Sequence, residues 1–188
     1  MKHAASRELY AYWDERRGRR AAPERADIEP GAIRQALGDA FIVALDAGAG
    51  HPFRLAGTRL CALFARELKG QSFIGLWTAA SQRTVTDLLA ILDNERVGTV
   101  AGVTAHNGDG QTLELELLLL PLSAPRPSLA RAIGVLAAFE IPPWLGALPL
   151  GPLSLGSRRH VGGSLDTSLL PRFMAQRRRF VVHQGGRA

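Results

Sequence analysis

The residues of this chain that could do chemistry begin with its only cysteine, Cys61. It lies in the stretch FRLAGTRLCALFARELKGQSFIGLW, residues 53–77. A thiol becomes a good nucleophile where electropositive neighbours lower its pKa, and Arg59 is close to Cys61 in the sequence. A free cysteine among apolar residues is more commonly buried and inert. We therefore expect Cys61 to be a packing residue rather than a nucleophile.

The other titratable residues show no recognisable catalytic or metal-binding pattern. Glu114 and Glu116 alternate on one predicted strand and could form a carboxylate pair, although such residues are more often the solvated side of a half-buried strand. The chain has no nucleophile elbow, phosphate-binding loop or HExxH motif. We expect neither catalysis nor a metal site, because no two histidines have the spacing of metal ligands. The histidines are His3, His51, His106, His160 and His183.

The composition favours one folded domain with a basic tail. The chain has 188 residues, of which 46% are hydrophobic, enough for one substantial core. Residues 1–156 hold 16 basic and 16 acidic side chains, whereas residues 157–188 hold seven arginines against Asp166 alone. Phe173 and Phe180 are interleaved with these arginines. We favour a solvated arm that attracts polyanions non-specifically, and the pattern also leaves open an acidic protein, nucleic acid or an acidic membrane surface as its partner.

The sequence indicates neither a membrane span nor a secretory route. The N-terminus lacks an apolar run followed by a small-residue cleavage site, so we expect no signal peptide. No apolar run reaches the roughly 18 residues that a transmembrane helix needs. A single cysteine cannot form an internal disulfide, which fits a reducing compartment. We expect a cytoplasmic protein without a transmembrane segment.

The elements that must position these residues follow from the hydrophobic spacing. Ser6 can cap a helix to about Arg17, and shorter helices are predicted from about residue 30 to 38 and after Thr58. The clearest helix covers residues 79–95, where apolar residues recur at i, i+3, i+4 and i+7. Strands are predicted at 40–46, 53–57, 96–106, 111–122 and 131–141, with the turn NGDG between the third and the fourth. This order predicts an α+β fold, an antiparallel sheet with helices on one face.

Four segments of the chain together resemble a PAS domain. They are DAFIVALD, FRLAGTRLCALFARELKGQSFIGLW, NGDGQTLELELLLLPL and RAIGVLAAFEIPPWLG. The pattern in the second segment is similar to that of a narrower family of bacterial PAS-type proteins with no settled function. The resemblance covers roughly residues 8–146 and also the RRHV and PRF patches of the tail. It implies a five-stranded antiparallel sheet in the order 2-1-5-4-3 with helices across one face.

The resemblance also suggests how the chain is organised. We expect an N-terminal helical extension at 1–38, a PAS-like domain at 39–146, and a Pro/Gly linker with an Arg-rich tail at 147–188. Light-sensing PAS domains place their cysteine in an Asn-Cys-Arg-Phe-type motif, whereas here it lies in RLCALF. Heme-binding PAS domains usually carry a histidine on the long helix, and residues 79–95 contain none. The cofactor is therefore unknown, with no heme, flavin or metal motif.

In this fold, ligands bind between the inner face of the sheet and the helices. The polar anchors of such a site would be Arg54, Arg59 or Arg83. The alternative is a filled core with no cavity, which we favour because aromatic and leucine stripes serve packing first. The candidate wall residues are Leu60, Phe64, Phe73, Trp77, Leu88, Val103, Leu115 and Leu117.

The fourth strand carries apolar residues on its polar face, which predicts a covering element. Leu118 and Leu120 interrupt that face, and an exposed apolar patch needs a cover. The helix with Leu9, Tyr12 and Trp13 is the natural candidate, either from the same chain or from a second copy. Because such helices often dimerise PAS domains, we expect a homodimer.

These observations leave two hypotheses for function. The first is a non-enzymatic sensory or regulatory module that binds a small ligand or a signalling partner and acts through protein–protein interaction. The second is an adaptor with a filled core whose basic tail binds an acidic protein, nucleic acid or a membrane surface. The chain contains no kinase, cyclase or DNA-binding effector, so we expect the output to pass through a partner.

Overall fold

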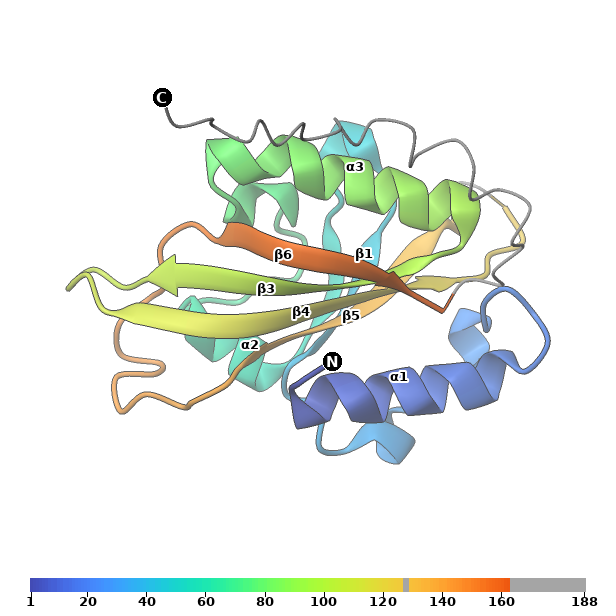
Figure 1. Cartoon of the computed structure of the whole chain (residues 1–188), viewed down its shortest axis with the longest axis horizontal. Helices are drawn as coiled ribbons and strands as arrows, with labels where there is room; N and C mark the ends of the chain where they lie inside the picture. The colour runs from blue at the N-terminus through green and yellow to red at the C-terminus, as the bar shows by residue number, and fades with distance from the viewer. Residues whose placement is uncertain (127–128, 163–188) are drawn as a thin grey trace, which may run out of the picture.

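The computed structural model describes residues 1–126 and 129–162 (Figure 1). Of the basic segment predicted at 157–188, residues 163–188, with Phe173 and Phe180, lie outside the described residues. The longer elements are α1 (Ala4–Arg17), β1 (Ala40–Ala44), β2 (Phe53–Ala56), α2 (Thr58–Leu63), α3 (Ala79–Glu95), β3 (Gly98–His106), β4 (Thr112–Leu122), β5 (Arg131–Ala138) and β6 (Ser154–Val161). Short 3-10 helices are η1 (Arg25–Asp27), η2 (Pro30–Ile33), η3 (Ala47–Ala49) and η4 (Ile74–Leu76).

The strands form one antiparallel sheet in the order β2-β1-β5-β4-β3-β6. The predicted order 2-1-5-4-3 and the α+β class are confirmed. β1 and β2 form a hairpin whose loop carries η3, and β3 and β4 form the long hairpin predicted from the turn NGDG. The register of β3 with β4 places Val103 opposite Leu115 and Ala101 opposite Leu117, so apolar residues meet across the strands.

The sixth strand was not predicted, and it lies in the segment that we expected to be linker and tail. β6 pairs with the outer side of β3, with His160 opposite Thr99 and Arg159 opposite Val100. The register shifts between Ala101 and Val103, so the pairing contains an irregularity. The sequence of β6 has no apolar alternation, because the strand lies at the edge of the sheet and most of its residues are exposed. Its position depends on the free edge of β3 rather than on its own hydrophobic pattern.

The inner face of the sheet is covered by α2, η4 and α3. The alternation of β4 places four leucines in this core, as the sequence predicts. Val85, Leu89 and Leu92 of α3 pack against them, together with Leu60 and Leu63 of α2. The four leucines are Leu113, Leu115, Leu117 and Leu119.

The opposite face of the sheet is covered by α1, which lies on the other side of the sheet from α3 (Figure 1). The helix begins at Ala4 rather than at Ser6, because the His3 side chain caps it by accepting a hydrogen bond from the Ala5 amide at 3.1 Å. Trp13 is fully buried on β4 and donates from Nε1 to the Pro121 carbonyl at 2.8 Å. In the described part of the chain, no helix combines the length and the apolar character that a membrane crossing requires.

Candidate functional site

The apolar residues predicted to line a ligand site do meet in the inner core. Phe64, Phe73, Trp77, Leu115 and Leu117 are all buried in one cluster between the sheet and the helices. The remaining predicted wall residues are also buried. They are Leu60, Leu88 and Val103.

Aromatic rings occupy the centre of this core. The ring of Phe73 lies 5.4 Å from that of Phe41, 5.6 Å from that of Phe53 and 5.8 Å from that of Trp77, measured between centroids. Phe41 and Phe53 are 5.7 Å apart. Centroid distances of 4.5–7 Å are those of packed aromatic pairs. The rings therefore pack against one another in the region where the sequence analysis predicted a ligand site.

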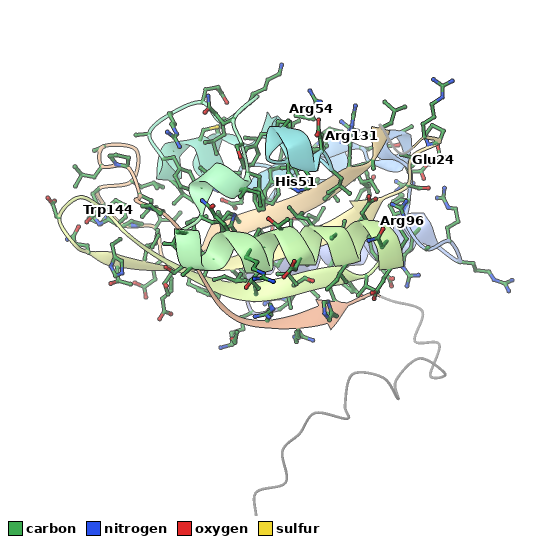
Figure 2. All side chains as sticks on the ribbon, turned by 90° about the horizontal axis from the view of Figure 1, so that it is seen from above. Glu24, His51, Arg54, Arg96, Arg131 and Trp144 are labelled. Carbon is green, nitrogen blue, oxygen red and sulfur yellow. The ribbon has the colours of Figure 1, made fainter. Side chains whose placement is uncertain are left out.

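The three arginines predicted as polar anchors lie outside this core. Arg54 and Arg83 are exposed, and Figure 2 shows Arg54 at the edge of the molecule. Arg59 donates from Nε and Nη2 to the two carboxylate oxygens of Asp39 at 3.0 and 2.7 Å. It also donates to the Gln35 carbonyl at 2.6 Å. The hydrogen bond with Asp39 raises the pKa of Arg59. Through these hydrogen bonds, the guanidinium joins α2 to the segment that precedes β1.

The position of Arg59 follows from a close approach of two backbone segments. A side chain at Gly57 would meet the carbonyl oxygens of Leu37 and Gly38, so only glycine allows α2 to start there. The Leu60 amide then donates to the Gly38 carbonyl at 3.0 Å. Spacing in the sequence does not reveal this approach, which turns Arg59 towards Asp39 and away from the core.

Cys61 lies half-buried on α2, beside the core. Its thiol donates to Oε1 of Glu67 at 3.1 Å. Burial and the neighbouring carboxylate raise its pKa, which disfavours the nucleophilic thiolate. These surroundings are those of an unreactive thiol.

Two polar side chains are buried near the inner core without a hydrogen-bond partner among the described residues. They are the Nε1 of Trp77 and both ring nitrogens of His51. His51 is 6% exposed and follows η3 with a backbone φ of 57° (Figure 2). Burial lowers its pKa, so the neutral imidazole is favoured. Sequence reasoning missed this residue, because a single histidine in a glycine-rich loop carries no periodic signal.

The outer face carries a buried carboxylate that the sequence analysis placed in solvent. Glu116 is 5% exposed and accepts hydrogen bonds from the backbone amides of Lys2 at 2.7 Å and His3 at 3.0 Å. Burial alone would raise its pKa, but these hydrogen bonds hold the pKa below its ordinary value. Glu114 remains exposed. The two carboxylates therefore have different surroundings, and Glu116 fixes the segment that leads into α1.

The residues predicted for a dimer interface cover one another within the single chain. Leu9, Tyr12 and Trp13 of α1 are buried in one cluster with Leu118 and Leu120 of β4. The sequence left open whether this helix covers the sheet of its own chain or that of a second copy, and in the structure it covers the sheet of its own chain. A dimer through these five residues would require α1 to exchange between two copies, and the homodimer stays a prediction.

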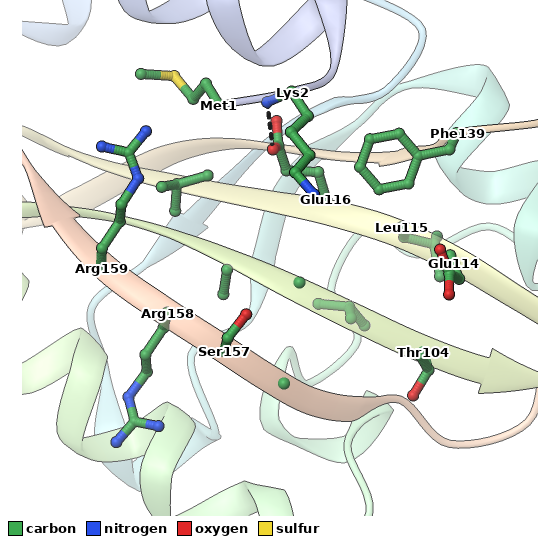
Figure 3. A pocket seen from close by; sticks show the side chains of 15 residues that line it. Met1, Lys2, Thr104, Glu114, Leu115, Glu116, Phe139, Ser157, Arg158 and Arg159 are labelled. Atoms are coloured by element: carbon green, nitrogen blue, oxygen red, sulfur yellow. Dashed lines mark hydrogen bonds between the residues drawn. The ribbon is translucent and has the colours of Figure 1, made fainter.

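An open hollow of about 520 Å³ lies on the outer face beyond the start of α1 (Figure 3). Its floor includes Gly102 of β3 and Gly156 of β6, and Lys2, Phe139 and Arg159 stand around it. Across residues 1–126 and 129–162, no group of three histidine, cysteine or acidic side chains is arranged to hold a metal ion.

The strands form an antiparallel α+β module whose inner face is packed with buried apolar side chains. A PAS domain family model matches residues 1–137. The chain therefore belongs to the PAS domain family. At the level of the family, this makes it a sensory signalling module.

Solved structures with similar folds are distant in sequence. The dark structure of the blue-light photoreceptor Aureochrome1 LOV is 15% identical with a TM-score of 0.44, covering 58% of this chain and 81% of that chain. The PAS domain of an HTR-like protein from Haloarcula marismortui is 19% identical with a TM-score of 0.41, covering 58% and 91%. The PAS domain of a protein from Colwellia psychrerythraea is 15% identical with a TM-score of 0.40, covering 56% and 92%. No curated protein matches the chain.

Proposed function

We propose that this chain is a non-enzymatic PAS-type regulatory module that acts by contact with a partner protein while its inner core stays filled by its own side chains. The observation that carries this proposal is the cluster of four aromatic rings centred on Phe73, with centroid distances of 5.4–5.8 Å. The predicted polar anchors point to the surface, so the core offers few groups that could orient a polar ligand.

Native mass spectrometry of the purified full chain tests the filled core. We expect the mass of the chain alone under gentle ionisation, identical to the mass after denaturation. A small molecule that is present in the native spectrum and lost on denaturation would overturn the proposal. A homodimer would appear in the same spectrum, and this dimer and a cytoplasmic location stay predictions from the sequence.

A second candidate function is sensing through a small ligand in the inner core. The observation that favours it is the pair of unpartnered buried groups, Trp77 Nε1 and the His51 imidazole. A buried donor without a partner costs about 1–3 kcal/mol, and a ligand that accepts from Trp77 would recover part of that cost. A Trp77→Phe variant separates the candidates. If the core is filled, the variant loses some stability because the smaller ring leaves a cavity, and its native mass stays that of the chain alone. Loss of a co-purified molecule in this variant would favour the ligand.

The proposed adaptor role of the basic tail rests on sequence alone. Of the seven arginines that follow residue 156, Arg158 and Arg159 lie in β6 and the other five lie outside the described residues, which end at Gly162. Binding of the full chain to acidic vesicles and to nucleic acid over a series of salt concentrations would test it. Binding that does not weaken with salt would contradict a polyanion-binding arm.

A further inference from the structure

The two edges of the sheet differ in what covers their backbone. At β2, the Gly70 amide donates to the Phe53 carbonyl at 2.8 Å, and the Phe53 amide donates to the Gln71 carbonyl at 3.0 Å. At β6, the Leu155 amide donates to the Ser81 hydroxyl at 3.0 Å. From residue 156 to 161, the backbone of β6 makes hydrogen bonds with β3 only, among the described residues. An antiparallel edge of this kind leaves a row of amide and carbonyl groups open to another strand.

Positive charge lines this open edge on both faces of the sheet. Arg158 and Arg159 are adjacent in β6 and point to opposite sides, Arg159 towards Met1 and Arg158 towards α3 (Figure 3). Both are exposed, and neither takes part in an ion pair formed within the described ranges. Charged side chains protect an edge strand against pairing with unselected chains. The same charges select for a strand of opposite charge.

The hollow of about 520 Å³ lies directly beside this edge. Its floor carries no side chains where β3 pairs with β6, because Gly102 and Gly156 lie there. A Cβ atom at Gly156 would lie 3.1 Å from the Gly102 carbonyl oxygen. Neighbouring strands lie about 4.8 Å apart, so a long side chain from an added strand can reach across Gly156 to this floor. Phe139, which is 41% exposed, supplies an apolar wall.

We propose that the free edge of β6 binds an extended acidic segment of a partner protein, which adds to the sheet as a further antiparallel or parallel strand. Acidic side chains of that segment lie beside Arg158 and Arg159, and an apolar side chain enters the hollow over Gly102 and Gly156. The proposal rests on the proposed function, since it names the surface and the partner chemistry through which the module acts.

Other occupants fit this edge less well. A second copy would bring the same pair of arginines to the shared edge, and like charges at an interface oppose association. A single-stranded nucleic acid would neutralise the arginines but would leave the open amide and carbonyl groups without partners. The strand also carries no aromatic side chain on which a base could stack, because its sequence is SLGSRRHV. An acidic peptide satisfies both the charges and the backbone.

A short-peptide library displayed on phage, selected on the immobilised full chain, tests the proposal without a known partner. Selected peptides are then measured by fluorescence anisotropy against the full chain and two charge-matched variants. The first variant is Arg158→Glu with Arg159→Glu, at β6. The second is Arg54→Glu with Arg66→Glu, both exposed and next to the opposite edge. Each selected peptide is also made with alternate backbone amides methylated, which removes the donors that a strand needs.

We expect the selected peptides to be acidic and to bind about tenfold or more weakly to the β6 variant, with a change below about twofold for the matched variant. Amide methylation should abolish binding. In nuclear magnetic resonance spectra of the unmodified chain, the peptide should shift the amides of residues 156–161 and not those of β2. This last readout keeps the test valid even if the β6 variant does not fold.

Several results would overturn the proposal. They are the absence of enriched peptides, equal loss in both variants, or unchanged binding of the methylated peptides. If an oligouridylate bound the unmodified chain more tightly than the peptides, and the β6 variant lost this binding, the edge would be assigned to nucleic acid. A dimer in the free chain that the β6 variant dissociates would assign it to a second copy. None of these results bears on the filled core, which the native mass spectrum tests separately.

Discussion

The two faces of the sheet are both covered, but by different kinds of contact. The inner face is filled by aromatic and aliphatic side chains from β1, β2, α2, α3 and the long hairpin, with Phe73 at the centre of four rings. The outer face is covered by α1 and by the segment at 22–36 that follows it, and specific polar contacts hold α1 in place. Glu116 binds the backbone before α1, and Trp13 binds the Pro121 carbonyl. The inner layer is therefore a packed core, and the outer layer is a cover with a few identifiable attachments.

The difference indicates where the molecule can respond to a partner. A close-packed core has little room to change without loss of stability. The cover leaves part of the outer face open, where the hollow lies between the start of α1 and β6. Each layer also contains a buried titratable group, and the surroundings of these two groups differ. Glu116 is hydrogen-bonded and charged, whereas His51 has no partner in the described structure and is neutral.

Phe73→Ala should have the largest effect, because it removes the ring that contacts three others in the inner core. We expect a loss of about 3–5 kcal/mol in the free energy of unfolding, from lost burial and from the cavity left behind. Urea unfolding followed by tryptophan fluorescence measures it. Ile141→Ala is the control, since this side chain is 69% exposed and its loss should cost within about 0.5 kcal/mol. A loss below about 1 kcal/mol for Phe73→Ala would show a loosely packed interior and would favour a ligand site.

Glu116→Gln should have the next largest effect and should act on the cover. We expect a loss of about 1–3 kcal/mol, because a neutral amide accepts the two backbone hydrogen bonds more weakly than a carboxylate. Hydrogen exchange should rise in α1 and stay unchanged in α3. Glu114 lies on the same face of β4 and is exposed, so Glu114→Gln should leave hydrogen exchange in α1 and the free energy of unfolding unchanged. Equal exchange in α1 before and after Glu116→Gln would mean that the carboxylate does not hold the helix.

The same carboxylate predicts a pH dependence. The pKa of Glu116 in the folded chain is below its ordinary value of 4.5, so the unfolded chain binds a proton first as the pH falls. The stability that Glu116 contributes is therefore fully present above about pH 4.5 and is lost as the pH falls through the lower, folded pKa. Acid titrations of unmodified chain and Glu116→Gln should converge in this range. Parallel curves would contradict a charged Glu116 in the folded state.

Much of the fold could be predicted because its signals are local or periodic. The alternation of β4 and the spacing in α3 identify their buried faces, and the turn NGDG identifies the hairpin. β6 could not be predicted, since its polar sequence pairs only because β3 offers an edge. The surroundings of Arg59 and Glu116 were also missed. Their partners, Asp39 and the Lys2 amide, are brought close by tertiary contacts that no spacing in the sequence describes.

His51 gives the smallest predicted effect and the sharpest contrast with Glu116. Burial holds the pKa of His51 below its ordinary value of 6.5, so between these two values the unfolded chain binds a proton that the folded chain does not. The free energy of unfolding should therefore fall as the pH drops below about 6.5 and through the lower, folded pKa of His51. His51→Asn should flatten this slope. Asparagine is suited to the position, because the backbone φ of 57° is one that asparagine adopts more readily than most residues.

The test compares how steeply the free energy of unfolding changes with pH in the unmodified chain and in His51→Asn. It does not compare their absolute stabilities, since an asparagine amide is also left without a partner at this site. His106→Asn is the matched control, because the same substitution is made at an exposed histidine. An unchanged slope in His51→Asn would mean that the imidazole accepts a proton as readily in the folded chain as in the unfolded one. Water or a bound group would then have to reach this ring, and the inner face would be less closed than its aromatic packing indicates.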